Sequence, residues 1–167
     1  MKLLLVEDHF LVAQAMGLHL TEAGHEIVGI AADAHEAVEL AGDMHPDLAL
    51  VDIQLAYGTS GIDAAREMLA RHNVRSLFVT SHYDAARAAN DAAVGYLRKP
   101  YSGRELIAAI QAAEAYLKIT KLTPCSPRLE CNEGPLVLLP AELRSGPTGS
   151  AFHSRLNPKH RALAGRG

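Results

Sequence analysis

The stretch DLALVDIQL, residues 47–55, decides the fold of this chain. Its first half, LALV at 48–51, is an unbroken apolar run, which is typical of a strand buried on both faces of a sheet. The run ends in a carboxylate, Asp52. The end of a parallel strand lies at the sheet edge where α/β proteins place their functional loops. The stretch therefore predicts a buried strand that delivers Asp52 to a functional site.

Apolar runs of this kind alternate with helical patterns through the first 120 residues. Residues 2–6, 26–32, 75–80 and 94–97 read as further strands, and residues 8–23, 34–44, 61–72, 83–92 and 102–117 have the apolar spacing of helices. Leu11, Ala15 and Leu18 share one face of the first helix, and Ser102 and Glu105 form the two ends of a capping box that opens the last one. Five strands alternating with five helices predict a parallel sheet with right-handed crossovers that cover both faces.

The pattern stops after about Thr120. Six of the eight prolines fall in the last 47 residues. The charge also changes, because residues 1–120 carry 9 Lys+Arg against 16 Asp+Glu (−7) and residues 121–167 carry 7 against 3 (+4). Apart from a brief apolar segment at 135–139, the tail can bury little apolar surface to offset its ordering entropy. We expect one domain at 1–120 and an irregular, largely disordered, Pro/Gly-rich basic tail at 121–167.

Composition also narrows the cellular setting. No run approaches the roughly 18 apolar residues of a membrane span, and the N-terminal MKLLLVED is too short for a signal-peptide core. Cys125 and Cys131 cannot form a disulfide framework. An acidic body does not suggest a nucleic-acid-binding core. We expect a cytoplasmic protein without a membrane partner.

Polar residues follow four of the five predicted strands. They are Glu7 and Asp8 after the first, Asp52 after the third, Thr80 at the end of the fourth and Lys99 after the fifth. Because parallel strands end at the same edge, these side chains should converge. Oxygen ligands of this type suit Mg²⁺. A carboxylate nucleophile, a divalent cation, an ammonium group and a hydroxyl are the parts needed for phosphoryl transfer onto an aspartate.

The chain resembles the receiver domains of two-component response regulators, in a stand-alone, single-domain form. The resemblance covers residues 2–118 and rests on VED at 6–8, VDIQL at 51–55, Gly61, VTS at 79–81 and GYLRKP at 95–100. It implies a flavodoxin-like, doubly wound sheet of five parallel strands in the order 2-1-3-4-5, flanked by five helices.

The resemblance also implies roles for individual residues. Asp52 would accept phosphate from a histidine kinase or a histidine phosphotransfer protein, as one step of a phosphorelay. Lys99 would pair with the phosphoryl group, Thr80 would move towards it, and Tyr96 would be the switch aromatic. The Lys99–Pro100 peptide bond would be cis.

The implied metal is Mg²⁺. Asp8, Asp52 and the backbone carbonyl of Gln54 would hold it, with Glu7 acting through water.

Two features depart from the usual receiver pattern. The interval from Thr80 to Lys99 is a few residues short, which predicts a short or irregular fourth helix. The loop at 57–60, Tyr-Gly-Thr-Ser, is longer by about one residue.

The favoured hypothesis is a phosphorylation-controlled switch that acts through protein–protein contacts. It would catalyse its own phosphorylation and dephosphorylation without being an enzyme in the turnover sense. A DNA-binding transcription regulator that uses the tail is less favoured, since the tail lacks two periodic helices with a turn between them. A haloacid-dehalogenase-type phosphatase would place a second Asp where Gln54 stands. A phosphate sink without output, a homodimer, and the identities of kinase and target stay open.

Overall fold

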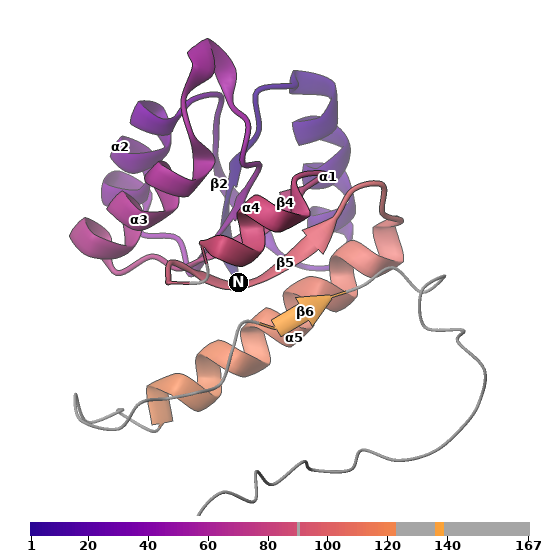
Figure 1. The fold of residues 1–167 in the computed structure, drawn as a ribbon. Coiled ribbons are helices and arrows are strands. Elements are labelled where there is room, and N and C mark those ends of the chain that lie inside the picture. The colour runs from indigo at the N-terminus through magenta and orange to yellow at the C-terminus, as the bar shows by residue number, and fades with distance from the viewer. Residues whose placement is uncertain (90, 123–135, 139–167) are drawn as a thin grey trace, which may run out of the picture.

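The computed structural model describes residues 1–89, 91–122 and 136–138. Its strands are all parallel and follow the order β2-β1-β3-β4-β5-β6 (Figure 1). The strands are β1 (Lys2–Val6), β2 (Glu26–Ala31), β3 (Leu48–Val51), β4 (Ser76–Thr80), β5 (Ala93–Arg98) and β6 (Leu136–Leu138). The helices are α1 (Phe10–Glu22), α2 (Ala34–Met44), the 3₁₀ turn η1 (Ala56–Gly58), α3 (Gly61–His72), α4 (Tyr83–Ala88) and α5 (Gly103–Leu122).

This topology confirms the predicted five-strand order 2-1-3-4-5 and adds the short β6 at the free edge of β5. β6 comes from the apolar segment noted at 135–139 of the tail. The predicted disorder of the tail otherwise lies outside the described residues.

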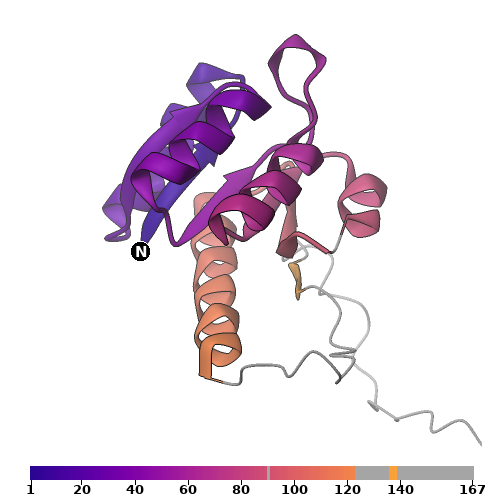
Figure 2. The ribbon, with the colours of Figure 1, turned by 90° about the vertical axis from the view of Figure 1, so that its left-hand side faces the viewer.

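Side chains of the sheet alternate between two apolar clusters, one on each face. Leu3 and Leu5 pack with α1 and α5, whereas Leu4 and Val6 pack with α2, α3 and α4. All residues of β3 and β4 are buried. The helices therefore lie on both faces of the sheet (Figure 2), and LALV at 48–51 is the doubly buried strand that its composition predicted.

The inner face of α1 differs from the predicted apolar face. Ala13, Met16 and Leu20 are buried against the sheet, while Leu11 is 79% and Leu18 is 59% exposed. Both stripes have helical spacing because α1 is apolar on nearly all sides, so periodicity alone could not choose between them.

The last two helices follow the sequence closely. α4 has only six residues, which agrees with the short interval before Lys99. At the start of α5, Ser102 Oγ accepts a hydrogen bond from the Glu105 N–H (3.3 Å) and Glu105 Oε2 accepts one from the Ser102 N–H (2.8 Å). The predicted capping box is therefore present. Within the described residues, no helix combines the length and the apolar character needed to cross a bilayer.

Candidate functional site

The backbone carries three of the predicted site residues to one edge of the sheet. The Glu7 N–H donates to the Ala31 carbonyl (2.9 Å), and the Asp52 N–H donates to the Val6 carbonyl (2.9 Å). On the other side, the Lys99 N–H donates to the Thr80 carbonyl (3.0 Å). Each residue thus continues the hydrogen bonding of its strand by one position, which fixes where its side chain begins.

Lys99 joins the two carboxylates at the centre of this edge. Its Nζ lies 2.6 Å from Glu7 Oε2 and 2.7 Å from Asp52 Oδ2. The Glu7 side chain is only 2% exposed and that of Asp52 is 14% exposed. Burial disfavours the charged ammonium group, but hydrogen bonds and attraction from Asp52 and Glu7 outweigh burial and raise the pKa of Lys99. The lysine is therefore held in its charged form beside Asp52.

These groups line a cavity of about 640 Å³. Its wall comes from the loops after β1, β3, β4 and β5, with Glu7, Asp8, His9, Val12, Asp52, Gln54, Leu55, Gly58, Thr59, Ser81 and Lys99. Residues that are ninety positions apart in the sequence meet here because the sheet is parallel, as the strand-end pattern predicts.

The donor atoms of the cavity fit a small divalent cation. Ligand atoms of Glu7, Asp8 and His9 all lie within 4.8 Å of one another. Asp52 lies outside that group and is tied to Lys99. Three carboxylates against one ammonium group leave a formal charge of −2, which one divalent cation would compensate. The donors are mainly hard oxygen atoms, the type that Mg²⁺ prefers.

His9 is an exposed residue that follows Asp8 directly and precedes α1. Its Nδ1 lies 2.8 Å from Asp8 Oδ1, and this hydrogen bond raises the pKa of the imidazole. No spacing rule could have singled it out, because its role depends on the rotamer of the adjacent aspartate.

Because residue 61 is a glycine, the start of α3 can lie directly against the backbone carbonyl of Asp52. The Gly61 N–H donates to the Ile53 carbonyl (2.8 Å), and a Cβ atom at position 61 would overlap the backbone carbonyl oxygen of Asp52. Only glycine fits this approach. The Asp52 carboxylate is further oriented by the Gln54 N–H, which donates to Oδ1 (3.3 Å).

The two predicted switch residues lie on adjacent strands. Thr80 is buried, and its hydroxyl oxygen accepts a hydrogen bond from the His82 N–H (3.1 Å). Tyr96 is also buried, in register with Phe78 of β4 and in the apolar cluster that includes Ala86 of α4. The aromatic residue therefore belongs to the cluster on the face of the sheet that α2, α3 and α4 cover.

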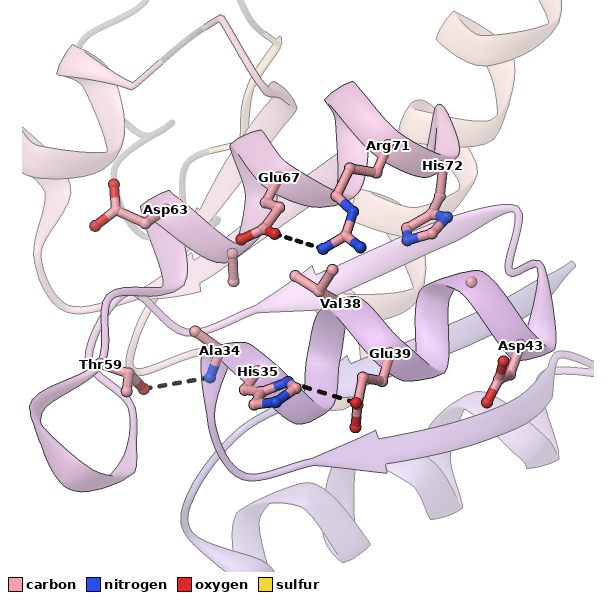
Figure 3. Close-up of a pocket in the computed structure, with 12 residues that line it drawn as sticks. Ala34, His35, Val38, Glu39, Asp43, Thr59, Asp63, Glu67, Arg71 and His72 are labelled. Carbon is pink, nitrogen blue, oxygen red and sulfur yellow. Dashed lines mark hydrogen bonds and ion pairs between the residues drawn. The ribbon is translucent and has the colours of Figure 1, made fainter.

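A larger hollow of about 790 Å³ lies between α2 and α3, away from Asp52. Figure 3 shows its charged rim, where Glu67 pairs with Arg71 and His35 with Glu39. Thr59 lines both this hollow and the Asp52 cavity. None of the residues predicted for the site lines this hollow.

A family model for the response regulator receiver domain matches residues 3–111. The chain belongs to this family. Its cis peptide bond at Lys99–Pro100 agrees with the resemblance seen in the sequence, and the receiver is that of a two-component response regulator.

The relatives of this receiver include proteins named as a transcriptional regulatory protein and as an anti-anti-sigma factor. The transcriptional regulatory protein PdtaR of Mycobacterium tuberculosis is 39% identical over 125 residues, covering 72% of this chain and 60% of PdtaR. The crystal structure of the response regulator PhyR from Brucella abortus has a TM-score of 0.67 and 30% identity, covering 74% of this chain and 51% of PhyR. The anti-anti-sigma factor PhyR from Bartonella quintana has a TM-score of 0.63 and 26% identity, covering 75% and 51%. The receiver thus spans about 60% or less of these relatives' lengths.

Proposed function

We propose that Asp52 is the phosphoacceptor of this receiver and that phosphorylation switches its contacts with another protein. The observation that carries the proposal is the Lys99 ammonium group, placed 2.7 Å from the Asp52 carboxylate at the carboxyl ends of the strands. A fixed positive charge beside a carboxylate nucleophile suits a reaction that brings a phosphoryl group to that position.

The proposed reaction transfers a phosphoryl group from a phosphohistidine of a histidine kinase or a histidine phosphotransfer protein. An oxygen of Asp52 forms a bond to phosphorus while the phosphorus–nitrogen bond of the donor breaks, and the released imidazole nitrogen takes up a proton. Lys99 stabilises the charge on the phosphoryl oxygens. The Gln54 N–H holds the carboxylate in position.

The residues proposed to hold Mg²⁺ are Asp8, Asp52 and the carbonyl of Gln54, with Glu7 acting through water. The bound ion would neutralise charge on the phosphoryl oxygens. The formal charge of −2 in the cavity and the oxygen-rich donor set support this assignment. Glu7 is the most buried of these acids and is also bound by Lys99, so its link to the metal is expected to be indirect.

We propose that Thr80 and Tyr96 report the phosphorylated state. Thr80 stands next to Lys99 through the β4–β5 hydrogen bonding, and Tyr96 is two residues before Arg98, the register partner of Thr80. A shift of the Thr80 hydroxyl towards a phosphoryl group would break its bond with the His82 N–H. Packing around Tyr96 and the short α4 would then change, which biases a two-state surface.

The output is proposed to be a protein–protein contact. The anti-anti-sigma factor PhyR supports this, since its name describes action on another protein. A nucleic-acid output through the tail is the second candidate, and the name of the transcriptional regulatory protein PdtaR is the observation in its favour. The acidic charge of residues 1–120 favours the first. We propose a cytoplasmic setting for this signalling.

Labelling with acetyl phosphate and Mg²⁺ tests the proposed acceptor. We expect the intact protein to gain one phosphoryl group, measured by mass spectrometry, and to lose it again as the acyl phosphate hydrolyses. Asp52→Asn should abolish labelling, whereas Asp63→Asn, an exposed acid of α3, should not change it. Equal labelling of the Asp52→Asn protein would refute the assignment, and sustained turnover of phosphomonoesters would point to a phosphatase instead.

A further inference from the structure

The connection between β3 and α3 is a small hairpin that rises beside the Asp52 cavity. Gln54 and Ser60 form an antiparallel bridge, and the Leu55 N–H donates to the Thr59 carbonyl (3.3 Å). The Thr59 N–H donates to the Ala56 carbonyl (3.1 Å), which closes a turn at Tyr57 and Gly58. We call residues 54–60 the β3–α3 hairpin. Figure 2 shows this connection standing clear of the helices.

The turn of the hairpin has an unfavourable residue at its tip. Tyr57 has φ 58° and ψ 23°, and Gly58 has φ 68°. Positive φ at both central residues is the type I′ geometry, for which Asn-Gly is the preferred pair. A bulky aromatic residue in the left-handed region is an outlier that costs energy. Tyr57 therefore occupies a position where Asn or Gly would fold at lower cost.

Among the described residues, no burial or hydrogen bond of the Tyr57 side chain offsets that cost. The Tyr57 side chain is 92% exposed, and within the described part of the chain its phenol has no hydrogen-bond partner. The two residues that flank the turn, by contrast, are fixed. The Thr59 hydroxyl accepts a hydrogen bond from the Ala34 N–H (3.3 Å, Figure 3), and the Ala56 N–H donates to the Ala32 carbonyl (3.2 Å). An anchored turn thus presents a solvated aromatic ring at a defined place.

That place lies on the approach to Asp52. Gln54, Leu55, Gly58 and Thr59 of the hairpin all line the cavity. A phosphorus atom must come within about 3–3.5 Å of the attacking oxygen, and the Asp52 side chain is only 14% exposed. A protein donor must therefore insert its phosphohistidine through the mouth of the cavity. The surface around that histidine would then contact the residues that surround the mouth of the cavity. Aromatic side chains are enriched among the residues that contribute most to binding at protein interfaces.

We propose that the Tyr57 ring is a docking contact for the phosphohistidine protein that serves Asp52, and so helps to select the phosphodonor. The inference rests on the proposed function of Asp52. It adds that acceptor chemistry and donor recognition are separable, because a small donor can enter the cavity without touching the tip of the hairpin.

The test compares a protein donor with a small donor. The protein donor is the autophosphorylated catalytic core of the histidine kinase that labels the unmodified chain fastest in a panel of purified kinases, and the small donor is acetyl phosphate. For Tyr57→Asn we expect kcat/KM for transfer from the kinase to fall about tenfold. Labelling by acetyl phosphate should stay within twofold of the unmodified protein. The thermal midpoint should be equal or higher, because Asn suits the turn.

Two control variants complete the design. Tyr57→Phe keeps the ring and should retain transfer from the kinase within about threefold. Met44→Asn removes an exposed apolar side chain at the end of α2 that does not line the cavity, and should leave both donors unaffected.

The outcomes separate this inference from the proposed function. Undiminished kinase transfer to Tyr57→Asn would overturn the docking role, as would an equal loss with both donors, which would place Tyr57 in the acceptor chemistry. Labelling by acetyl phosphate but by no kinase would also overturn it. Failure of acetyl phosphate to label the unmodified chain at all would instead refute the acceptor role of Asp52 and remove the basis of the inference.

Discussion

Lys99 is the residue on which the electrostatics of the site depend. Lys99→Met would leave Glu7, which is 2% exposed, with a buried carboxylate and no counter-charge from position 99. Removing one partner of a buried pair costs roughly 3–5 kcal/mol, and the partial exposure of Lys99 reduces this to about 2–3 kcal/mol. We expect chemical denaturation to show that loss. The double variant Glu7→Gln/Lys99→Met should recover at least half of it, and a double variant as unstable as Lys99→Met would contradict the explanation.

The pH dependence of stability gives the same residue an independent test. The pKa of Lys99 is raised in the folded state, so its contribution is complete below the unfolded pKa of about 10.4 and is lost as the pH rises through the higher folded value. The unmodified protein should therefore lose stability relative to Lys99→Met in alkaline solution. Between pH 7 and 9 the difference between the two proteins should be constant.

The close approach of Gly61 to the Asp52 backbone leads to a further prediction at the scale of one residue. In Gly61→Ala the new methyl group would overlap the Asp52 carbonyl, so β3 and α3 must separate. We expect a loss of about 2 kcal/mol or more in the free energy of unfolding, together with slower labelling by acetyl phosphate. Gly17→Ala is the matched control. Its Cβ would meet only ordinary contacts in α1, and the change should stabilise the helix by about 0.5–1 kcal/mol.

The helices show how far local sequence signals determine structure. Ser102 and Glu105 form the capping box that their spacing predicted, because capping depends only on residues three apart. The inner face of α1 could not be predicted in the same way. It depends on which of two apolar stripes packs better against Leu5 and its neighbours, and that is settled by the tertiary fold.

The same contrast holds at the candidate site. The meeting of Asp52, Lys99 and Glu7 followed from strand ends in a parallel sheet. The hairpin and its exposed Tyr57 did not. The sequence showed only a loop about one residue longer than usual, and the turn geometry depends on hydrogen bonds of Thr59 to Ala34 and Ala56.

Ser102→Ala tests the capping of α5. The substitution removes the hydroxyl that accepts the Glu105 N–H and donates to Glu105 Oε2. We expect the free energy of unfolding to fall by about 1 kcal/mol. Ser60→Ala provides a comparison at α3, where the Ser60 hydroxyl accepts the Asp63 N–H. A smaller loss at Ser60 than at Ser102 would indicate that the hydrogen bond from the Ser102 hydroxyl to Glu105 adds stability, and equal losses would mean that this bond contributes nothing.

At the scale of the whole molecule, α5 extends beyond the region that the family model matches. The family match stops at residue 111, whereas α5 continues to Leu122 and buries Ala113 in the cluster under α1. Tyr116 and Leu117 are partly buried against the same cluster. We propose that the receiver ends with α5, and the boundary near 120 stays a prediction that truncation tests.

Truncation provides the final prediction. A protein of residues 1–122 loses β6, a strand of three residues, and should lie within about 1–2 kcal/mol of the full chain, since a few ladder hydrogen bonds are each worth roughly 0.5–1.5 kcal/mol. It should be labelled by acetyl phosphate at the rate of the full chain. A protein of residues 1–111 loses Ala113, Tyr116 and Leu117 and should be several kcal/mol less stable. If 1–122 unfolds as easily as 1–111, the tail must belong to the folded unit, and β6 would be an integral strand of the sheet.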